Sequence, residues 1–357
     1  MRRNGNSRFF EAVCVIGVLL FFAFPLSGES SLDGQLKILL AEFSEQIEEA
    51  GISIQEFESL LISDSDRPYE MEVLRLYLEK KIGDLKQSAG AEDGAAAVVG
   101  KKTERIGSGG TTPRGIRVTA SVQEREDSVD ISVSFPRTAK TSIRLAKEPD
   151  LIALLGQEYT DSRYASAGGG ELFSLVVRGA DGSAYPVRRV NGRSVITVQR
   201  GTGYRIVLEN RLSEEISAAV FVDGINTILQ GRELPSTGYK WVVDSNSRFV
   251  LPGWQHDNSR VSSFIFTDSG SGAAARLGYG ESPGVITAVF YVQEKEPERS
   301  QGNYSLGNRG VGNSAAVRSI GAATGYGEAA SGSVQEVYTE NVKRAVRIIQ
   351  LWYEFDR

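Results

Sequence analysis

The chain has 357 residues, which is enough for two domains at roughly 150 residues each. Its 45 acidic and 40 basic residues give a formal net charge of −5, and this balance gives no reason to expect nucleic acid as a partner. With one cysteine, Cys14, and one histidine, His256, the sequence excludes a conventional zinc site, and we expect no cofactor and no metal.

Residues 1–28 have the order of regions found in a signal peptide. Arg2, Arg3 and Arg8 precede an uncharged apolar run from Ala12 to Pro25, and small residues follow it. We expect cleavage to give a mature chain that starts near Glu29 to Ser31, without cysteine and without a membrane span. The expected location is the bacterial periplasm, the cell envelope or the extracellular space. An uncleaved N-terminal anchor is the alternative.

Residues 29–89 are expected to be helical. Two stripes of apolar residues at three- and four-residue spacing predict helices: Leu36, Leu39, Leu40, Phe43 and Ile47, then Met71, Leu74, Leu78, Ile82 and Leu85. Gly51 is a candidate cap of the first helix. Between the stripes, Ser53 and Glu56 match a capping box and predict a short helix over Ser53–Leu61. Residues 90–115, rich in small residues, predict a flexible linker.

Residues 116–167 are expected to complete a small N-terminal α+β unit. Alternating apolar residues over Ile116–Val122 and again over Val129–Phe135 predict a hairpin. The charged turn between them, Glu124 to Ser128, is typical of a solvated hairpin tip, because its acids lack the spacing of a calcium loop. Asp150–Leu155 is expected to be a short helix.

From residue 168 the apolar pattern changes to a two-residue period. Short strands separated by Gly, Asn and Asp turns predict an antiparallel β-sandwich or barrel, and we expect a sandwich over 168–294. Val285–Val292 is apolar on both faces, which predicts a central buried strand. Residues 295–333 are expected to be a Gly-rich excursion, either a mobile binding loop or a disordered segment. Residues 334–357 are expected to form a strand region that closes the sheet.

The residues offer little catalytic chemistry. A Ser-His-Asp or Cys-His arrangement needs an imidazole base, and His256 lies in a polar turn where an exposed loop histidine is the simpler interpretation. Glycoside hydrolysis needs just two acids, and the candidates lie at predicted strand ends, where aspartate is also a turn former: Asp223, Asp244, Asp257 and Asp268. Gly325 to Glu328 lacks the Lys-Ser/Thr tail of a phosphate-binding loop, so we expect an ordinary loop there. We therefore expect no catalytic residues.

A possible binding surface lies around one predicted hairpin. Aromatic rings beside polar loop groups are typical of interfaces and of carbohydrate platforms. The surface would comprise Tyr239, Trp241, Trp254, His256 and Asn258. The alternative is that the two tryptophans simply fill the core.

The segment from Tyr204 onward resembles an uncharacterised family of secreted bacterial β-domains. The matching residues are Tyr204-Arg205-Ile206, Glu209-Asn210, Val222-Asp223-Gly224, Asn226, Ile228, Gly238-Tyr239, Gly253-Trp254, Phe264, Phe266-Thr267-Asp268, Gly284-Val285-Ile286 and Gly325 to Glu328. Asp244–Ser247 replaces the Pro-Gly turn of that family. The resemblance covers about half the chain and implies an extracytoplasmic sandwich, without an activity or site residues. The helices and the Val118–Phe135 hairpin resemble periplasmic proteins that help to assemble curli and flagella.

Together these features predict a non-catalytic protein of the bacterial cell envelope that binds a protein or a cell-surface polymer through loops and strand edges of its β-domain. Two alternatives remain open at this point: a carboxylate-dependent glycan hydrolase, and an assembly factor for a surface appendage.

Overall fold

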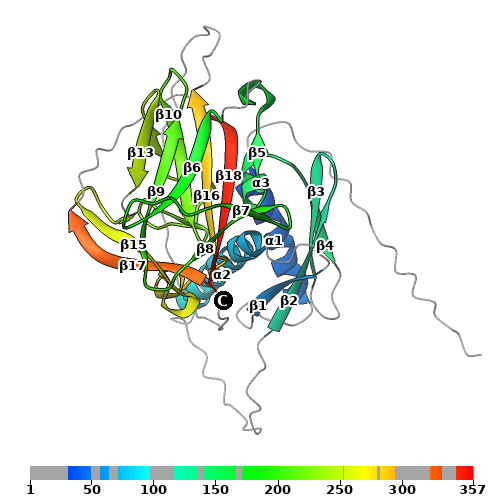
Figure 1. Cartoon of the computed structure of the whole chain (residues 1–357). Coiled ribbons are helices and arrows are strands. Elements are labelled where there is room, and N and C mark those ends of the chain that lie inside the picture. Colours follow the sequence, from blue (N-terminus) through cyan, green and yellow to red (C-terminus); the bar gives the residue numbers. More distant parts are fainter. Residues whose placement is uncertain are drawn as a thin grey trace, which may run out of the picture.

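A computed structural model of the chain describes residues 31–49, 57–63, 71–96, 116–134, 140–165, 171–251, 253–279, 282–293, 322–331 and 343–356. The fold is rich in β-structure, with sheets of four, eight and six strands and four α-helices among these residues (Figure 1). The predicted signal peptide and Cys14 lie outside the described residues. Within the described part, no helix combines the length and apolar character that crossing a bilayer requires.

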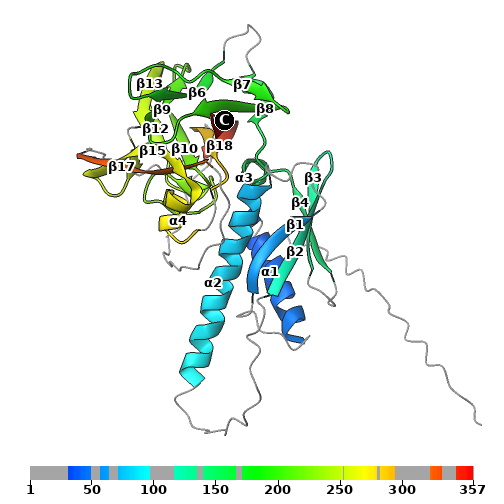
Figure 2. The same cartoon turned by 60° about the horizontal axis from the view of Figure 1, so that its bottom comes forward.

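The N-terminal helices lie beside the four-stranded sheet (Figure 2). The sheet has the order β1-β2-β3-β4, with β1 parallel to β2 and the other neighbours antiparallel. The elements are α1 (Leu32–Glu49), β1 (Phe57–Ser63), α2 (Glu72–Ala96), β2 (Ile116–Glu124), β3 (Ser128–Ser134) and β4 (Thr141–Ala146). The described side chains of the two apolar stripes, all except Ile47, lie in one cluster with alternate residues of β2 and β3, as a helix face packed on a sheet requires; Leu85 is partly buried against it. Both long helices and the hairpin are therefore confirmed.

Two sequence predictions in this part are wrong. A helix is predicted over Ser53–Leu61, but the described end of this segment belongs to strand β1, which pairs in parallel with β2. A short apolar run fits a helix or a strand, and here the pairing with β2 favours the strand. Ser53, Glu56 and Gly51 lie outside the described residues. The predicted linker begins too early, because α2 continues through Gly90 to Ala96, and alanine is the strongest helix former.

The eight-stranded sheet has the strand order β11-β10-β16-β18-β8-β7, with β12 on β10 and β5 on β18. Its strands are β5 (Tyr159–Thr160), β7 (Arg188–Val190), β8 (Arg193–Val198), β10 (Ile216–Val222), β11 (Ile225–Asn226), β12 (Trp241–Val243), β16 (Val285–Gln293) and β18 (Lys343–Phe355). β16 is buried on both faces between β10 and β18, as predicted. The sheet is not wholly antiparallel, since the last strand, β18, runs parallel to β8.

The six-stranded sheet has the order β13-β9-β15-β14, with β6 on β9 and β17 on β15. Its strands are β6 (Phe173–Gly179), β9 (Gly203–Asn210), β13 (Ser247–Leu251), β14 (Gly253–Gln255), β15 (Arg260–Asp268) and β17 (Ala322–Ser331). All of these pairings are antiparallel. Short helical turns follow β5 and β15: η2 (Ser162–Tyr164), η3 (Ser269–Ser271) and α4 (Ala273–Arg276).

Strand β17 corrects the prediction that residues 295–333 are an excursion and that Gly325 to Glu328 is a loop. The small residues of this strand serve close packing against β15. A Cβ atom on Gly325 would lie 2.9 Å from Thr267 Cγ2, and one on Gly327 would lie 2.4 Å from Ser263 Oγ. Glycine here therefore marks a close approach of two strands, not a turn.

The two larger sheets share one hydrophobic cluster, and a second cluster joins the N-terminal helices to the eight-stranded sheet. The first includes stacked aromatic rings of Tyr204, Phe264 and Phe266. The second contains the described side chains of both helical stripes together with Val195, Leu234, Val285 and Trp352. Helix α3 (Pro149–Leu154), close to the prediction, is tied to β18, because Gln350 Nε2 donates to the Ala153 carbonyl at 3.1 Å. The predicted boundary near residue 168 is thus crossed by core contacts.

Candidate functional site

The two tryptophans of the predicted binding surface are core residues. Trp241 is 4% exposed and Trp254 is fully buried. Each indole N–H has an internal acceptor: Trp241 donates to Thr227 Oγ1 at 2.9 Å and Trp254 to the Gly325 carbonyl at 3.1 Å. Gly253 allows this packing, because a Cβ there would lie 2.0 Å from the Ser262 carbonyl oxygen. Trp241 and Trp254 are therefore not part of an exposed binding surface, and the alternative, that they fill the core, is confirmed.

The other three predicted residues are accessible. Tyr239 is 48% exposed. His256 is half-buried directly after β14, and Asn258 is exposed in the turn that follows. Residues 226–239 form a loop that the sequence did not indicate as functional, and we call it the 226–239 loop. His256 contacts this loop through a hydrogen bond with Gln230.

Hydrogen bonds to the neighbours of His256 indicate which ring nitrogen of the neutral imidazole carries the proton. The Gln230 side-chain oxygen accepts from the Tyr326 hydroxyl, which leaves the Gln230 amide N–H to donate to His256 Nδ1 at 2.7 Å. The ring proton therefore lies on Nε2, which donates to Ser262 Oγ at 2.9 Å. A serine nucleophile needs the reverse, an Nε2 lone pair that accepts the serine proton. In this arrangement the imidazole holds the loop in place and does not activate Ser262.

The 226–239 loop has an unusual backbone. Leu229 and Gln230 both lie in the left-handed region, with φ of 55° and 60°. A bulky non-glycine residue rarely adopts this conformation, which costs roughly 1–2 kcal/mol. The Leu229 side chain is nevertheless 51% exposed, so little burial offsets that cost.

Hydrogen bonds on both sides hold the loop in this form. Leu229 N donates to the Gln255 carbonyl at 2.9 Å, and Gln255 N donates to the Thr227 carbonyl at 2.8 Å. Asn226 Oδ1 accepts from Ile228 N at 2.8 Å, while Asn226 Nδ2 donates to the Tyr239 carbonyl at 3.0 Å. The exposed Leu229 is therefore carried by a fixed loop.

The Glu233 side chain folds back inside the 226–239 loop and lies close to Gly231 and Gly238. A Cβ on Gly231 would lie 2.0 Å from its Oε2, and one on Gly238 would lie 2.8 Å from its Cγ. Burial raises the pKa of Glu233. The two glycines therefore provide the space into which this carboxyl group folds.

The four candidate acids have separate sets of partners. Asp223, which is 1% exposed, accepts from Gly284 N at 2.9 Å, Val285 N at 3.2 Å, Thr324 N at 3.0 Å and Tyr353 OH at 2.7 Å.

The other three candidates lie nearer the surface, and none of them shares a described partner with Asp223. Asp257 accepts from Ser259 N and Arg260 N in a turn, and these bonds, with the Arg260 side chain, hold its pKa well below its usual range. Asp268 pairs with Arg200 at 2.6 Å, and Asp244 is exposed. Within the described ranges, no group of three or more His, Cys, Asp or Glu side chains is placed to hold a metal ion.

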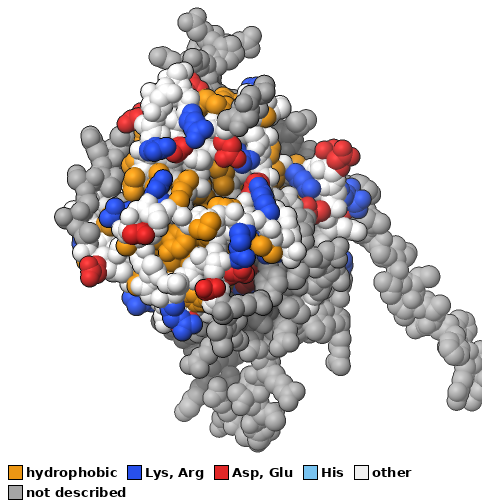
Figure 3. All heavy atoms as spheres, in the orientation of Figure 1, with side chains coloured by type: hydrophobic (Ala, Val, Ile, Leu, Met, Phe, Trp, Pro, Cys, Tyr) orange, Lys and Arg blue, Asp and Glu red, His pale blue; other side chains and the backbone are white. Residues whose placement is uncertain are grey.

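A row of valines lies on one face of the six-stranded sheet. Val176, Val207 and Val250 are cross-strand neighbours on β6, β9 and β13. Val250 is 47% exposed. Figure 3 shows hydrophobic side chains near the centre of the viewed face, with both basic and acidic side chains around them.

Sequence reasoning missed Leu229, Gln230 and Tyr326. Of these, Tyr326 had a readable signal, since it alternates with small residues over Ala323–Gly327 as a strand would. No family model matches the chain, and no curated protein or solved structure matches it either.

Proposed function

We propose that the chain is a non-catalytic binding protein of the bacterial cell envelope, and that its binding surface is formed by Leu229, Tyr239, His256 and Asn258. The partner is a protein or a cell-surface polymer. The observation that carries the proposal is the conformation of Leu229, an exposed leucine held at positive φ.

An exposed apolar side chain on a strained, fixed loop costs stability without adding to the core. Such conformations persist where the surrounding structure enforces them, and they cluster at ligand clamps and other functional sites. Holding the side chain in place before binding also lowers the entropy lost on association. Leu229 and Tyr239 supply apolar contact area, and the exposed Asn258 supplies a polar group. Both ring nitrogens of His256 bond within the protein, so His256 contributes its half-buried ring and holds the loop in place.

The location and the finer architecture belong to the same proposal. We propose cleavage of residues 1–28, a β-sandwich made by the two larger sheets, and an attached α+β unit of the helices and the four-stranded sheet. The hydrophobic cluster common to both larger sheets supports the sandwich. The resemblance to secreted bacterial β-domains rests on the ordered residues named above. N-terminal sequencing of protein from the envelope fraction should give a start near Glu29 to Ser31, and an intact Met1 on a cytoplasmic species would contradict it.

The binding surface is tested with two substitutions at one position. Leu229→Ala removes the side chain, and Leu229→Gly removes it and also relieves the backbone strain. The matched control is Val187→Ala, which removes an equally exposed apolar side chain (55%) outside the loop. Immobilised protein would be exposed to envelope extract and to a panel of cell-surface glycans, with bound material quantified for each variant.

Both Leu229 variants should lose the bound partner while the Val187 variant retains it. Equal capture by all three would refute the surface. The rival glycan hydrolase predicts released sugar from the panel, and a loss of orders of magnitude in that release when one acid of a catalytic pair becomes an amide.

A further inference from the structure

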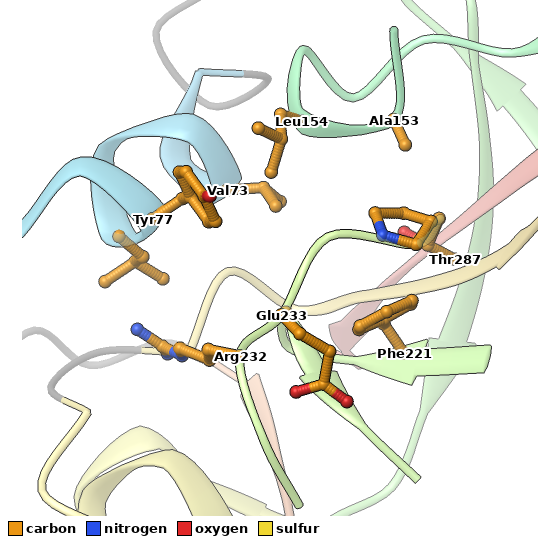
Figure 4. A pocket seen from close by; sticks show the side chains of 11 residues that line it. Val73, Tyr77, Ala153, Leu154, Phe221, Arg232, Glu233 and Thr287 are labelled. Atoms are coloured by element: carbon orange, nitrogen blue, oxygen red, sulfur yellow. The ribbon is translucent and has the colours of Figure 1, made fainter. Parts of the chain in front are cut away.

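The pocket where the 226–239 loop meets helices α2 and α3 is too small for an organic ligand. Side chains of the two helices line one side, and those of the loop and strands line the other (Figure 4). Its volume is about 30 Å³, which has room for water only. An edge of the six-stranded sheet offers a larger surface, because strand β13 lies at one end of the strand order of that sheet.

The backbone groups of β9 alternate between its two neighbours. Arg211 N donates to the Leu172 carbonyl, which continues the ladder between β9 and β6. Hydrogen-bonded pairs alternate with non-bonded pairs in an antiparallel ladder, so Glu209 and Val207 also bond to β6. Leu208, which lies between them, therefore directs its N–H and C=O groups to β13.

The same alternation fixes the free backbone groups of β13. Leu208 is opposite Phe249, so Phe249 bonds to β9, whereas its neighbours Arg248 and Val250 direct their N–H and C=O groups away from β9. These four groups have no hydrogen-bond partner among the described residues. Another strand fits such an edge, because its own N–H and C=O groups recur at the same two-residue spacing.

The side chains of the same two residues lie on the solvent face of the sheet. Val250 is 47% exposed and continues the row of valines from Val207. The Arg248 side chain is 67% exposed and shares the Glu209 carboxylate with Arg211, at 2.5 and 2.9 Å. Two guanidinium groups for one carboxylate leave a positive charge beside the edge.

We propose that the β13 edge binds an extended segment of a partner protein, which adds an antiparallel strand to the six-stranded sheet. The added strand exchanges hydrogen bonds with Arg248 and Val250. Direct cross-strand pairing favours an apolar residue opposite Val250 and an acidic residue opposite Arg248. This edge is separate from the Leu229 surface, and either can exist without the other.

Two other occupants fit the edge less well. If two copies of this chain paired antiparallel about Phe249, their Arg248 side chains would be diagonal neighbours, and charges on edge strands oppose such self-pairing. An anionic polymer fits poorly because the turns next to the edge carry three exposed acids: Glu214, Glu215 and Asp244. The acidic preference is therefore local to the position opposite Arg248.

The probe is a synthetic peptide, acetyl-Thr-Glu-Thr-Val-Thr-Glu-Thr-amide. Its valine fits opposite Val250 and a glutamate two residues away fits opposite Arg248, since side chains on one face of a strand recur every second residue. The control peptide has N-methylvaline at the centre, which removes one backbone donor and leaves the charge unchanged. Calorimetry measures binding, and hydrogen exchange over residues 247–251 locates it.

Proline substitutions test the edge in the protein itself. Val250→Pro removes one outward N–H group and leaves the hydrogen bonds to β9 intact. The matched control is Arg189→Pro in β7, an edge strand of the other large sheet. Val190 closes the turn Asn191-Gly192 by pairing with β8, so the N–H group of Arg189 also faces away from β8. Arg248→Ala removes the cation opposite the glutamate.

We expect the valine peptide to bind wild type and Arg189→Pro with similar affinity and to slow hydrogen exchange at Arg248 and Val250. Val250→Pro should melt close to the wild-type midpoint and bind roughly tenfold or more weakly, and Arg248→Ala should bind about threefold more weakly. The N-methylated peptide should bind wild type roughly tenfold or more weakly, which tests the edge without any change to the protein.

Four results would overturn the proposal: no saturable binding of the valine peptide, equal affinity for the two peptides, equal affinity of wild type and a folded Val250→Pro variant, or unchanged exchange over residues 247–251. Sedimentation velocity adds a further check. A dimer of this chain that Val250→Pro dissociates would assign the edge to a second copy and would also overturn the proposal.

Discussion

Asp223 offers the sharpest test of how the β-rich part is held together. Its carboxyl group accepts from three backbone N–H groups, those of Gly284, Val285 and Thr324, and from the Tyr353 hydroxyl. These donors come from the start of β16, from β17 and from β18, so one side chain joins three strands of two sheets. Asp223→Ala would leave the three backbone donors buried without an acceptor. At roughly 1–3 kcal/mol for each, the expected loss is on the order of 3–9 kcal/mol.

The replacement Asp223→Asn allows a measurement on a folded protein. Asparagine tolerates the positive φ of 54° at this position. Its oxygen can serve Gly284 and Val285, but its NH₂ group faces the Thr324 N–H, which loses its acceptor. At about pH 4, where the carboxyl group is largely neutral, the variant should be less stable by roughly 1–3 kcal/mol.

The pH dependence gives the second half of this prediction. Burial raises the pKa of Asp223 from 3.8 to about 6, although the hydrogen bonds that it accepts act in the opposite direction. A carboxyl group with a raised folded-state pKa contributes stability below its unfolded pKa and loses that contribution as pH rises through its folded pKa. Between about pH 4 and pH 7, wild type should therefore lose on the order of 3 kcal/mol relative to Asp223→Asn.

Urea unfolding of both proteins across this pH range, followed by far-UV circular dichroism, measures the difference. The control is Asp181→Asn, an exposed turn aspartate that accepts from Ser183 N at 2.9 Å and should change stability little at either pH. A constant difference between wild type and Asp223→Asn from pH 4 to 7 would refute the pH argument. If Asp223→Asn and wild type have the same free energy of unfolding at pH 4, the argument from the lost Thr324 N–H hydrogen bond is refuted.

Three further predictions concern packing and charge. Gly253→Ala should destabilise by about 1–3 kcal/mol, because the new Cβ meets the Ser262 backbone, while Gly270→Ala, with nothing within 4 Å, should leave the thermal midpoint nearly unchanged; equal midpoints would contradict this. Trp254→Ala should cost roughly 3–5 kcal/mol in urea unfolding, since the ring is fully buried, and a loss below 1 kcal/mol would be inconsistent with a core role. Burial by itself raises the pKa of Asp33. Hydrogen bonds from Lys37, Lys81 and Tyr77 lower that pKa by more than burial raises it, so the net pKa lies well below the usual range. Wild type should therefore lose stability relative to Asp33→Asn as pH falls below 4, the opposite sign to Asp223, and parallel pH profiles would show that the α1–α2 contact is not ionic.

Elements with a strong repeat were predictable from the sequence alone. Each of these repeats fits only one kind of element. Apolar stripes predict α1 and α2, alternation predicts β3, and an apolar run on both faces predicts the buried strand β16. Strand β1 was not predictable, because Leu60, Leu61 and Ile62 fit a helix as well as a strand until β2 pairs with them. Strand β17 was hidden by its alanines and glycines, which indicate a loop locally and a close strand approach only once β15 is in place.

The candidate site was predictable only in outline. The sequence pointed to the region of His256 and Tyr239, yet two of the five residues were wrong, because the identity of a tryptophan does not reveal which face of the strand it occupies. Nothing local marks Leu229 and Gln230 for positive φ, since Gly231 next to them is the natural choice for that conformation. Their backbone is set by β14, through the Gln255 contacts.

Two residues of the 226–239 loop, three positions apart, lower the stability of the fold. Leu229 is exposed and strained at positive φ, and Arg232 is buried with two nitrogens that have no hydrogen-bond partner among the described residues. A loop selected for stability alone would have glycine at the first position and an apolar residue at the second. The double variant Leu229→Gly/Arg232→Met should therefore be at least as stable as wild type. Relief of the left-handed leucine contributes up to about 1 kcal/mol, and removal of the unpaired charge adds to it.

Urea unfolding of the single and double variants measures these contributions, and the variants that lack Leu229 should also fail in the capture assay. A double variant less stable than wild type by more than about 1 kcal/mol would mean that the two residues hold the loop together. In that case the two residues stabilise the fold itself, and the conformation of Leu229 gives no reason to expect a binding partner at this loop.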